Sequence, residues 1–406
     1  MITRRFNPLI LLNKKTSILL LGPRGTGKTA IITAGFAELA NTVIIDLLRG
    51  RDFQRFVNSP QLLGDELRQR LSERGDRLFV AIDEVQKIPA LMDEVHSLIE
   101  EFKGRISFLL SGSSARKLRR GGVNLLAGRA IGRFLHPLHQ SETALNLSKV
   151  LKLGSLPAVY LNSDDLAVEI LESYVSTYLR EEIQQEAIVR SIDRFSRFLE
   201  FAGQVNGEPI NFAKLGKQIG VVGKTAAEYF SILVDTLIVI QVPGWSQSVK
   251  KQLLQANKYY FFDTGVLNAL NGYLRIDLRE SSFLYGKLFE TFIVSQLSAT
   301  NDYSDLAFRF FYWRDSDGKE VDLILARNVV EPIAAIEIKS SSAPDSADCP
   351  GFKPFAEDYP NVPKICICTT QRAYVRDGVL FEPWQSAVTD LVSVIERARS
   401  ASNVSG

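Results

Sequence analysis

The chain of 406 residues is poor in the residue types that build metal centres and disulfide frameworks. Its three cysteines, Cys349, Cys366 and Cys368, are too few for a disulfide scaffold or a four-cysteine zinc site. Its three histidines are too scattered for a histidine-built metal centre. Acidic and basic residues nearly cancel, with a formal net charge of +2, so no strong overall field attracts polyanions.

Long apolar runs are also missing. No uninterrupted apolar stretch approaches the roughly 18 to 20 residues that a membrane-spanning helix needs. The apolar run near the N-terminus is closed by Lys14 and Lys15, and no small-residue cleavage site follows. We therefore expect a cytoplasmic protein in a reducing compartment, with no membrane partner.

What the sequence does contain is an ordinary apolar content of 46%, in a length that suggests about two or three domains. Four nearly continuous apolar runs, at 17–22, 42–48, 78–83 and 106–111, alternate with amphipathic segments. Parallel strands covered on both faces show this pattern. It predicts an α/β domain with a parallel sheet over residues 1–150.

Three further parts are expected. Residues 151–202 are predicted to be helical, because apolar residues recur there at helical spacing. Residues 203–278 have the pattern of helix, turn, helix and strand, and residues 279–406 that of a second α/β domain. Strands of this last part are expected at 308–314, 320–326, 334–341 and 364–370.

The segment GPRGTGKT at 22–29 fits the phosphate-loop pattern G-x-x-x-x-G-K-[ST] completely, between an apolar strand and a helix-like segment. Backbone N–H groups of such a loop wrap the β-phosphate, Lys28 places a cation at the β and γ oxygens, and Thr29 offers a hydroxyl to Mg²⁺. No N-K-x-D guanine-reading pattern is found, which favours ATP over GTP. The residues expected to contact the nucleotide are Gly22, Pro23, Arg24, Gly25, Thr26, Gly27, Lys28, Thr29 and Ala30.

Two later apolar runs end in polar residues that suit the same site. Asp83 ends LFVAID and would hold Mg²⁺ together with Thr29, while Glu84 beside it would polarise the attacking water. Ser111 or Ser113, after the next run, could touch the γ-phosphate or that water. The expected catalytic residues are Lys28, Glu84, Ser113 and Arg129.

Arg129 belongs to a basic interval, since no Asp or Glu occurs between Glu101 and Glu142. The interval is interpreted as a polyanion-binding surface, as a set of phosphate sensors or as a solvated loop. In the second case Arg129 would be an arginine finger, acting in cis or, in a homo-oligomer, in trans. The basic residues are Lys103, Arg105, Arg116, Lys117, Arg119, Arg120, Arg129 and Arg133.

Together these motifs resemble a family. GPRGTGKT, FVAIDEVQKIP, FLLSGSSARKLRRGGVNLLAGRA, GSLPAVY (154–160) and YLREEIQQEAIVR (178–190) look like prokaryotic AAA-type ATPases that carry a C-terminal domain of unknown function. The resemblance covers nearly the whole chain. It implies a P-loop ATPase core, a helical segment, a winged helix and a nuclease-like C-terminal domain, and it lies near both regulatory and DNA-processing ATPases.

The winged-helix candidate lies in 210–245, where Asn211 is expected to cap the first helix and Gly220 to end it. The second helix would enter the major groove of DNA, or the unit would only relay the nucleotide state of the ATPase. The aromatic run KYYFFDTG is expected to be a buried strand. The residues considered for DNA contact are Lys224, Thr225, Glu228 and Tyr229 on the helix and Lys250, Lys251 and Lys258 near the wing.

Carboxylates form a further constellation in residues 279–406. Glu290 lies on a predicted helix, Asp322 on a strand, and Glu337 and Lys339 on the same face of another strand. Two or three carboxylates could hold a second Mg²⁺, and Lys339 could orient the water that attacks a phosphodiester. This arrangement looks like the PD-(D/E)xK nuclease core, either active or degenerate. Cys366 and Cys368 are expected to pack.

The sequence thus predicts an Mg²⁺-dependent, ATP-hydrolysing protein of the AAA type that acts on DNA and could cut it. The alternative is an ATP-driven regulatory switch whose output is a protein–protein interaction, with an inactive nuclease-like domain.

Overall fold

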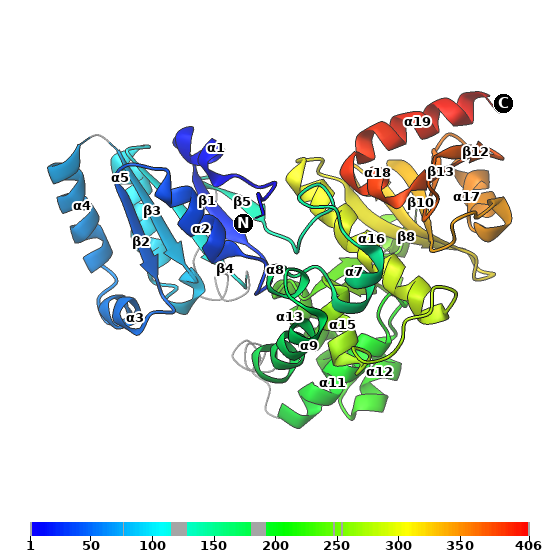
Figure 1. The fold of residues 1–406 in the computed structure, drawn as a ribbon, viewed down its shortest axis with the longest axis horizontal. Coiled ribbons are helices and arrows are strands. Elements are labelled where there is room, and N and C mark those ends of the chain that lie inside the picture. The colour runs from blue at the N-terminus through cyan, green and yellow to red at the C-terminus, as the bar shows by residue number, and fades with distance from the viewer. Residues whose placement is uncertain are drawn as a thin grey trace. The chain divides into compact units, whose positions relative to one another are not determined.

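The computed structural model describes residues 2–75, 77–114, 128–179, 192–246, 248–252 and 255–404. The chain forms two compact units (Figure 1). The first unit comprises Met1–Leu138 with Asp235–Ile238, and the second His139–Val234 with Val239–Gly406. Within the described ranges, no helix is both long and apolar enough to cross a bilayer.

The first unit is built on a five-stranded parallel sheet with the order β2-β3-β4-β1-β5. The four strands predicted from apolar runs are confirmed, and β5 is an addition. It lies at an edge and is half exposed, so its residues do not form an apolar run. The strands are β1 (Ser17–Leu21), β2 (Thr42–Asp46), β3 (Leu78–Asp83), β4 (Ile106–Gly112) and β5 (Ala130–Phe134).

Helices cover both faces of this sheet, as its alternation of buried side chains requires (Figure 1). Ile18 and Leu20 of β1 pack in one core with α1 and α2, whereas Leu19 and Leu21 pack in the other with α3, α4 and α5. The helices are α1 (Pro8–Asn13), α2 (Lys28–Ala37), α3 (Gly50–Val57), α4 (Leu62–Arg74) and α5 (Leu91–Phe102), with a 3₁₀ turn η1 (Val85–Lys87).

The second unit begins with a helical part, as expected for the middle of the chain. Asn211 caps α12 through its side chain, and Gly220 ends that helix in the left-handed conformation, so both predicted helix boundaries are confirmed. The two strands β6 and β7 pair antiparallel. The elements are α7 (Leu147–Leu153), α8 (Pro157–Tyr160), α9 (Asp164–Ser173), the π-helical turn η2 (Tyr174–Leu179), α11 (Ile192–Gln204), α12 (Phe212–Ile219), α13 (Gly223–Asp235), β6 (Val239–Val242), α14 (Val249–Gln252), β7 (Lys258–Phe261) and α15 (Thr264–Leu270).

A six-stranded mixed sheet forms the rest of the second unit, in the order β12-β13-β11-β10-β9-β8. The four predicted strands are present, and β12 and β13 extend the sheet. Cys349, Cys366 and Cys368 are free thiols buried against one face of it, so the prediction that the last two pack is confirmed. The elements are α16 (Phe283–Tyr303), β8 (Arg309–Arg314), β9 (Glu320–Ala326), β10 (Pro332–Lys339), the 3₁₀ turn η3 (Ser346–Asp348), α17 (Phe352–Asp358), β11 (Lys364–Cys368), β12 (Tyr374–Arg376), β13 (Val379–Pro383), α18 (Trp384–Thr389) and α19 (Leu391–Val404).

The segment after β6 ties the helical part to this sheet. The Tyr312 N–H of β8 donates to Pro243 O at 2.9 Å, and the Trp245 N–H donates to Tyr312 O at 2.6 Å. The Trp245 ring is buried and meets Phe311 edge to face, with ring centroids 5.0 Å apart. The helical part and the mixed sheet therefore belong to one unit.

Candidate functional site

The phosphate-loop segment connects β1 to α2, and its backbone depends on glycine. Gly25 and Gly27 have backbone φ angles of 84° and 96°, which residues other than glycine rarely adopt. Gly22 lies against the chain after β5, because a Cβ there would stand 2.4 Å from Leu135 O. Thr26 is buried and its hydroxyl donates to Pro23 O at 2.9 Å, which closes the loop on itself. Arg24 and Ala30, also expected to contact the nucleotide, are exposed.

Lys28 is the first residue of α2 and is folded back over the loop. Its Nζ donates to Gly22 O at 2.8 Å and to Pro23 O at 3.1 Å, and only 5% of the residue is exposed. The Lys28 ammonium is therefore held inside the loop, where the oxygens of a bound phosphate could replace the carbonyls as its hydrogen-bond acceptors.

Asp83 joins three elements at the carboxyl edge of the sheet. It is 1% exposed, and its two oxygens accept from different hydroxyls. Thr29 Oγ1 donates to Oδ2 at 2.5 Å, and Ser111 Oγ, at the end of β4, donates to Oδ1. A buried carboxylate beside a hydroxyl at a phosphate loop provides the oxygen ligands that Mg²⁺ prefers. The residues present therefore fit the ion that the sequence predicts.

Glu84 follows Asp83 in the left-handed conformation, with φ of 57°. Its backbone N–H donates to Ser111 Oγ at 3.1 Å. Its carboxylate Oε2 accepts from Gln86 Nε2 and, at 3.4 Å, from Ser113 Oγ. The fold thus brings together Lys28, Thr29, Asp83, Glu84 and Ser113. Sequence reasoning gave no role to Gln86, although it lies within the segment FVAIDEVQKIP that carries the resemblance.

Arg129 lies at the amino ends of the strands, opposite the carboxyl ends where the phosphate loop lies. The register pairs Ala130 with Ser17, at the amino end of β1, whereas the phosphate loop follows the carboxyl end. Five residues of strand separate the two levels by about 13 to 17 Å. Arg129 Nε donates instead to Glu100 at the end of α5. The geometry therefore does not support a role for Arg129 as an arginine finger at the phosphate loop of its own chain.

The rest of the basic interval divides between described and undescribed residues. Lys103 and Arg105, which flank the amino end of β4, lie at the same edge as Arg129. They too are far from the phosphate loop, so the structure disfavours a role for them as phosphate sensors. Arg116, Lys117, Arg119 and Arg120 lie outside the described residues.

The second constellation also converges, in the second unit. Lys339 Nζ lies 2.7 Å from Glu337 Oε2 on the same strand and 4.0 Å from Asp322 Oδ2 on the neighbouring strand β9. Asp322 Oδ2 also accepts from the Ile338 N–H at 2.8 Å. Two carboxylates and one ammonium therefore share one patch of the sheet.

Burial dominates the electrostatics of this patch. Glu337 is 1% exposed, and burial, followed by repulsion from Asp322, raises its pKa well above the usual range. Burial alone would lower the pKa of Lys339, but Asp322 and Glu337 outweigh it and raise that pKa. Among the described residues, Glu337 Oε1 has no hydrogen-bond partner although it is buried. Because one ammonium faces two carboxyl groups, the raised pKa favours the protonated, neutral form of Glu337.

Glu290 is turned to other partners. Its Oε1 accepts from the Tyr260 hydroxyl at 2.6 Å and lies 3.9 Å from Lys258 Nζ. Lys258 Nζ also bonds Glu320, and the residue is 2% exposed. Burial would lower the pKa of Lys258, but Glu290 and Glu320 outweigh it and raise that pKa. The expectation that Lys258 contacts DNA from a wing is therefore wrong, because carboxylates of α16 and β9 enclose it.

Only one pair of carboxylates among the described residues of this patch is arranged to hold a metal ion. Within the described ranges, no group of three or more His, Cys, Asp or Glu side chains is arranged to hold a metal. Asp322 and the unpartnered oxygen of Glu337 remain, and a pair of carboxylates completed by water is a normal Mg²⁺ site.

The residues of the winged-helix candidate that were considered for DNA contact differ in their exposure. Lys224 and Glu228 are exposed on α13 and Thr225 is half-buried, whereas Tyr229 packs in the core against Phe195 and Phe198. Tyr229 is thus not available to DNA. Lys250 on α14 is exposed. The aromatic strand β7 is buried, as predicted.

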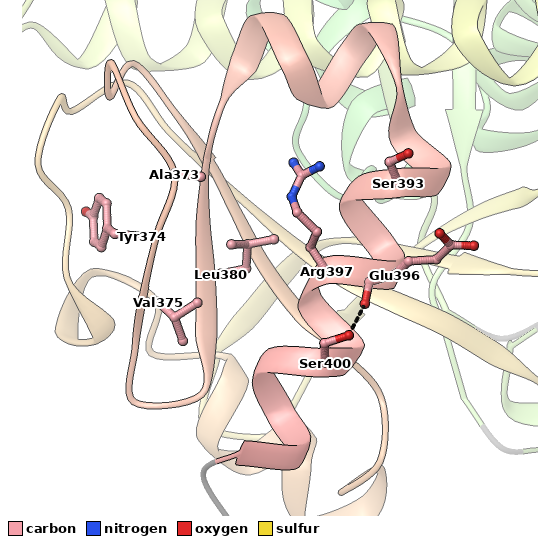
Figure 2. A pocket seen from close by; sticks show the side chains of 8 residues that line it. All are labelled: Ala373, Tyr374, Val375, Leu380, Ser393, Glu396, Arg397 and Ser400. Atoms are coloured by element: carbon pink, nitrogen blue, oxygen red, sulfur yellow. Dashed lines mark hydrogen bonds between the residues drawn. The ribbon is translucent and has the colours of Figure 1, made fainter.

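A hollow of about 620 Å³ lies between the β12–β13 hairpin and α19 (Figure 2). Tyr374 and Val375 line one side, and Ser393, Arg397 and Ser400 the other. Arg397 is engaged with the buried Glu382, at 2.7 Å. None of the candidate site residues predicted from the sequence lines this hollow.

Three family models match consecutive parts of the chain. Residues 14–144 match an AAA domain. Residues 145–278 match a domain of unknown function, DUF8612, and residues 285–386 another, DUF4143. The uncharacterized protein Rv2008c of Mycobacterium tuberculosis is 27% identical over 338 residues, which cover 82% of this chain and 72% of its own. The uncharacterized protein Mb2031c of Mycobacterium bovis shows the same identity and coverage.

Solved structures show weaker similarity. The Thermotoga maritima RuvB Holliday junction branch migration motor is 17% identical with a TM-score of 0.26, over 58% of this chain and 87% of that one. PCH-2 of C. elegans is 15% identical with a TM-score of 0.27, over 66% of this chain and 62% of that one. The functional assignment therefore depends on the family models and the site geometry: the chain carries an AAA-type P-loop ATPase domain followed by two domains of unknown function.

Proposed function

We propose that the first unit binds and hydrolyses ATP with Mg²⁺. The observation that carries this proposal is the hydrogen bond of Thr29, at the end of the phosphate loop, to the buried Asp83 at the end of β3. A loop that binds phosphate and a carboxylate that binds metal are thereby joined at one point.

The residues divide the work. Backbone N–H groups of residues 22–29 hold the phosphates, and Lys28 exchanges its loop carbonyls for β- and γ-phosphate oxygens. Thr29 and Asp83 would hold Mg²⁺, which neutralises charge on the phosphates when it is bound. Glu84 orients the attacking water and accepts its proton, and Ser113 contacts the γ-phosphate side of the site.

Substitution of Glu84 tests these roles. Glu84→Gln keeps the shape and the ATP affinity but loses the proton acceptor, so steady-state hydrolysis should fall by about 100-fold or more. Nucleotide binding is measured in parallel with a fluorescent ATP analogue. Normal turnover in this variant would remove Glu84 from the mechanism.

A second candidate function belongs to the mixed sheet. We propose that Asp322 and Glu337 hold a divalent cation and that Lys339 orients a water for attack on a phosphodiester, as in a PD-(D/E)xK nuclease. The unpartnered, buried Glu337 Oε1 favours it. Glu337→Ala and Lys339→Ala should each abolish Mg²⁺-dependent DNA cleavage, while Lys353→Ala, on α17, should not. Cleavage that persists in both variants would rule out this site.

The output of ATP hydrolysis has two proposed forms. In the first, α13 contacts DNA and hydrolysis is coupled to it. In the second, ATP switches a protein–protein interaction. The exposed Glu228 carboxylate beside Lys224 on α13 favours this second form, because a carboxylate there repels the phosphates of DNA. Hydrolysis rates with single-stranded, duplex and branched DNA distinguish them. Several-fold stimulation by one DNA form supports the first, and a rate that ignores every form supports the second.

A further inference from the structure

Gln86 is hydrogen-bonded to the Glu84 carboxylate, to which hydrolysis is assigned. It is the middle residue of η1, and it is 4% exposed. The left-handed conformation of Glu84 starts this tight turn, which returns the Gln86 side chain toward Glu84. Gln86 Nε2 donates both to Glu84 Oε2 and, at 3.0 Å, to Ser113 Oγ. A single amide thus connects the end of β3 with the chain that follows β4.

These bonds divide the two oxygens of Glu84. Both hydrogen bonds to its carboxylate, from Gln86 and from Ser113, end on Oε2. Within the described residues, no hydrogen bond engages Oε1. One oxygen is therefore fixed to the protein, and the other is available to a water molecule. A base held in this way has one orientation instead of several, and orientation is a large part of general-base catalysis.

A glycine makes room for this arrangement. A Cβ on Gly112 would stand 2.8 Å from Gln86 Oε1, closer than such contacts normally are. Gly112 ends β4, and its backbone conformation would admit alanine, so contact with Gln86 is what restricts the position.

We propose that Gln86 is a positioning residue for ATP hydrolysis: it fixes Glu84 through Oε2 so that Oε1 meets the attacking water. This inference depends on the proposed ATPase function. It adds that the amide acts only through Glu84, without contact to the nucleotide. Loss of the amide should then reduce turnover and leave binding unchanged.

The first experiment measures kcat and KM of the full-length chain with Gln86→Leu, which keeps the side-chain size. We expect kcat to fall about 10- to 100-fold with KM within about threefold of the wild type. Gln69→Leu, which removes an exposed amide on α4, is the matched control and should leave both constants unchanged. Gly112→Ala should reproduce the Gln86→Leu defect by displacing the same amide.

Two further variants separate positioning from a purely structural role. In a Glu84→Gln background, Gln86→Leu should cause no additional loss, because a residue that acts through Glu84 has nothing left to orient. Gln86→Glu can donate to Glu84 only as the protonated acid. Its rate should therefore be nearest to the wild type at low pH and fall progressively as pH rises.

The outcomes are distinct. If Glu84→Gln hydrolyses ATP normally, the role of Glu84 falls and that of Gln86 falls with it. If Glu84→Gln is inactive while Gln86→Leu keeps the wild-type kcat, or loses activity only through a raised KM, the positioning role alone is overturned. A further loss in the double variant would likewise overturn it.

Discussion

Asp263 Oδ2 accepts a hydrogen bond from the Ser155 N–H at 2.7 Å, across 108 residues of sequence. Its Oδ1 accepts from the Val266 N–H at 3.1 Å and so caps α15. Gly154 must be glycine because a Cβ there would stand 2.1 Å from this carboxylate. One buried side chain thus connects the GSLPAVY segment to the start of α15.

This carboxylate should make the stability of the second unit depend on pH. Burial raises the pKa of Asp263 to about 6, above the usual value near 3.8, although the backbone N–H groups oppose this. The folded state therefore takes up a proton before the unfolded chain does, and this contribution to stability grows as pH falls from about 7 to about 4. Asp263→Asn cannot titrate. Between pH 7 and pH 5, the free energy of unfolding of the wild type should gain about 1 to 3 kcal/mol relative to the variant.

Urea unfolding followed by tryptophan fluorescence measures this difference. All three tryptophans, Trp245, Trp313 and Trp384, lie in the second unit and report on it. A difference between wild type and variant that stays constant with pH would contradict the prediction.

Lys28→Ala should weaken nucleotide binding itself. The variant removes the ammonium that the carbonyls of Gly22 and Pro23 hold in the phosphate loop. The dissociation constant for ATP should rise about 10- to 100-fold, because a charged hydrogen bond to phosphate is lost. Titration with a fluorescent ATP analogue measures it, with Lys217→Ala, exposed on α12, as control. Unchanged affinity would refute the assignment of the loop.

Lys258→Met should destabilise the second unit strongly. It leaves Glu290 and Glu320 without their buried ammonium, and breaking a buried ion pair from one side costs about 3 to 5 kcal/mol. Lys250→Met, at an exposed position, should cost less than about 0.5 kcal/mol. The double variant Lys258→Met with Glu320→Gln should recover part of the loss. Equal stability of the two single variants would show that the cluster contributes nothing.

Arg129→Ala distinguishes a finger in trans from a surface ion pair. At protein concentrations where the chain is monomeric, its hydrolysis rate should equal that of the wild type, because Arg129 is far from its own phosphate loop. If copies associate through the finger, only the wild type should show a specific activity that rises with concentration. Glu100→Gln removes the ion pair between Glu100 and Arg129 and serves as the comparison. A defect of Arg129→Ala that persists at high dilution would contradict the geometry.

The sequence predicted the parts of the fold whose residues carry their own signal. The strands β1, β3 and β4 are buried on both faces, so apolar runs identified them. The half-exposed edge strand β5 carries no such run and was missed. In the same way, the phosphate loop and the pair Asp83 and Glu84 were predicted because local motifs encode them, and they lie together as parallel topology requires.

The errors concern residues whose environment is set at long range. Lys258 is considered for DNA contact near the wing, yet its surroundings are decided by Glu320, 62 residues away. Gln86 lies within the motif FVAIDEVQKIP, but the motif alone does not say which side chains its amide contacts. Its contact with Ser113 exists only once β3 and β4 are paired.

The burial of Lys258 also decides how the chain can be dissected. A cut between residues 278 and 285, where the two family models part, leaves β7 on one fragment and both α16 and β9 on the other. The C-terminal fragment would then expose Glu290 and Glu320 as an uncompensated acidic pocket, and the other fragment would carry an ammonium with no counter-charge. The two domains of unknown function should therefore be expressed, assayed and exchanged between relatives as one piece.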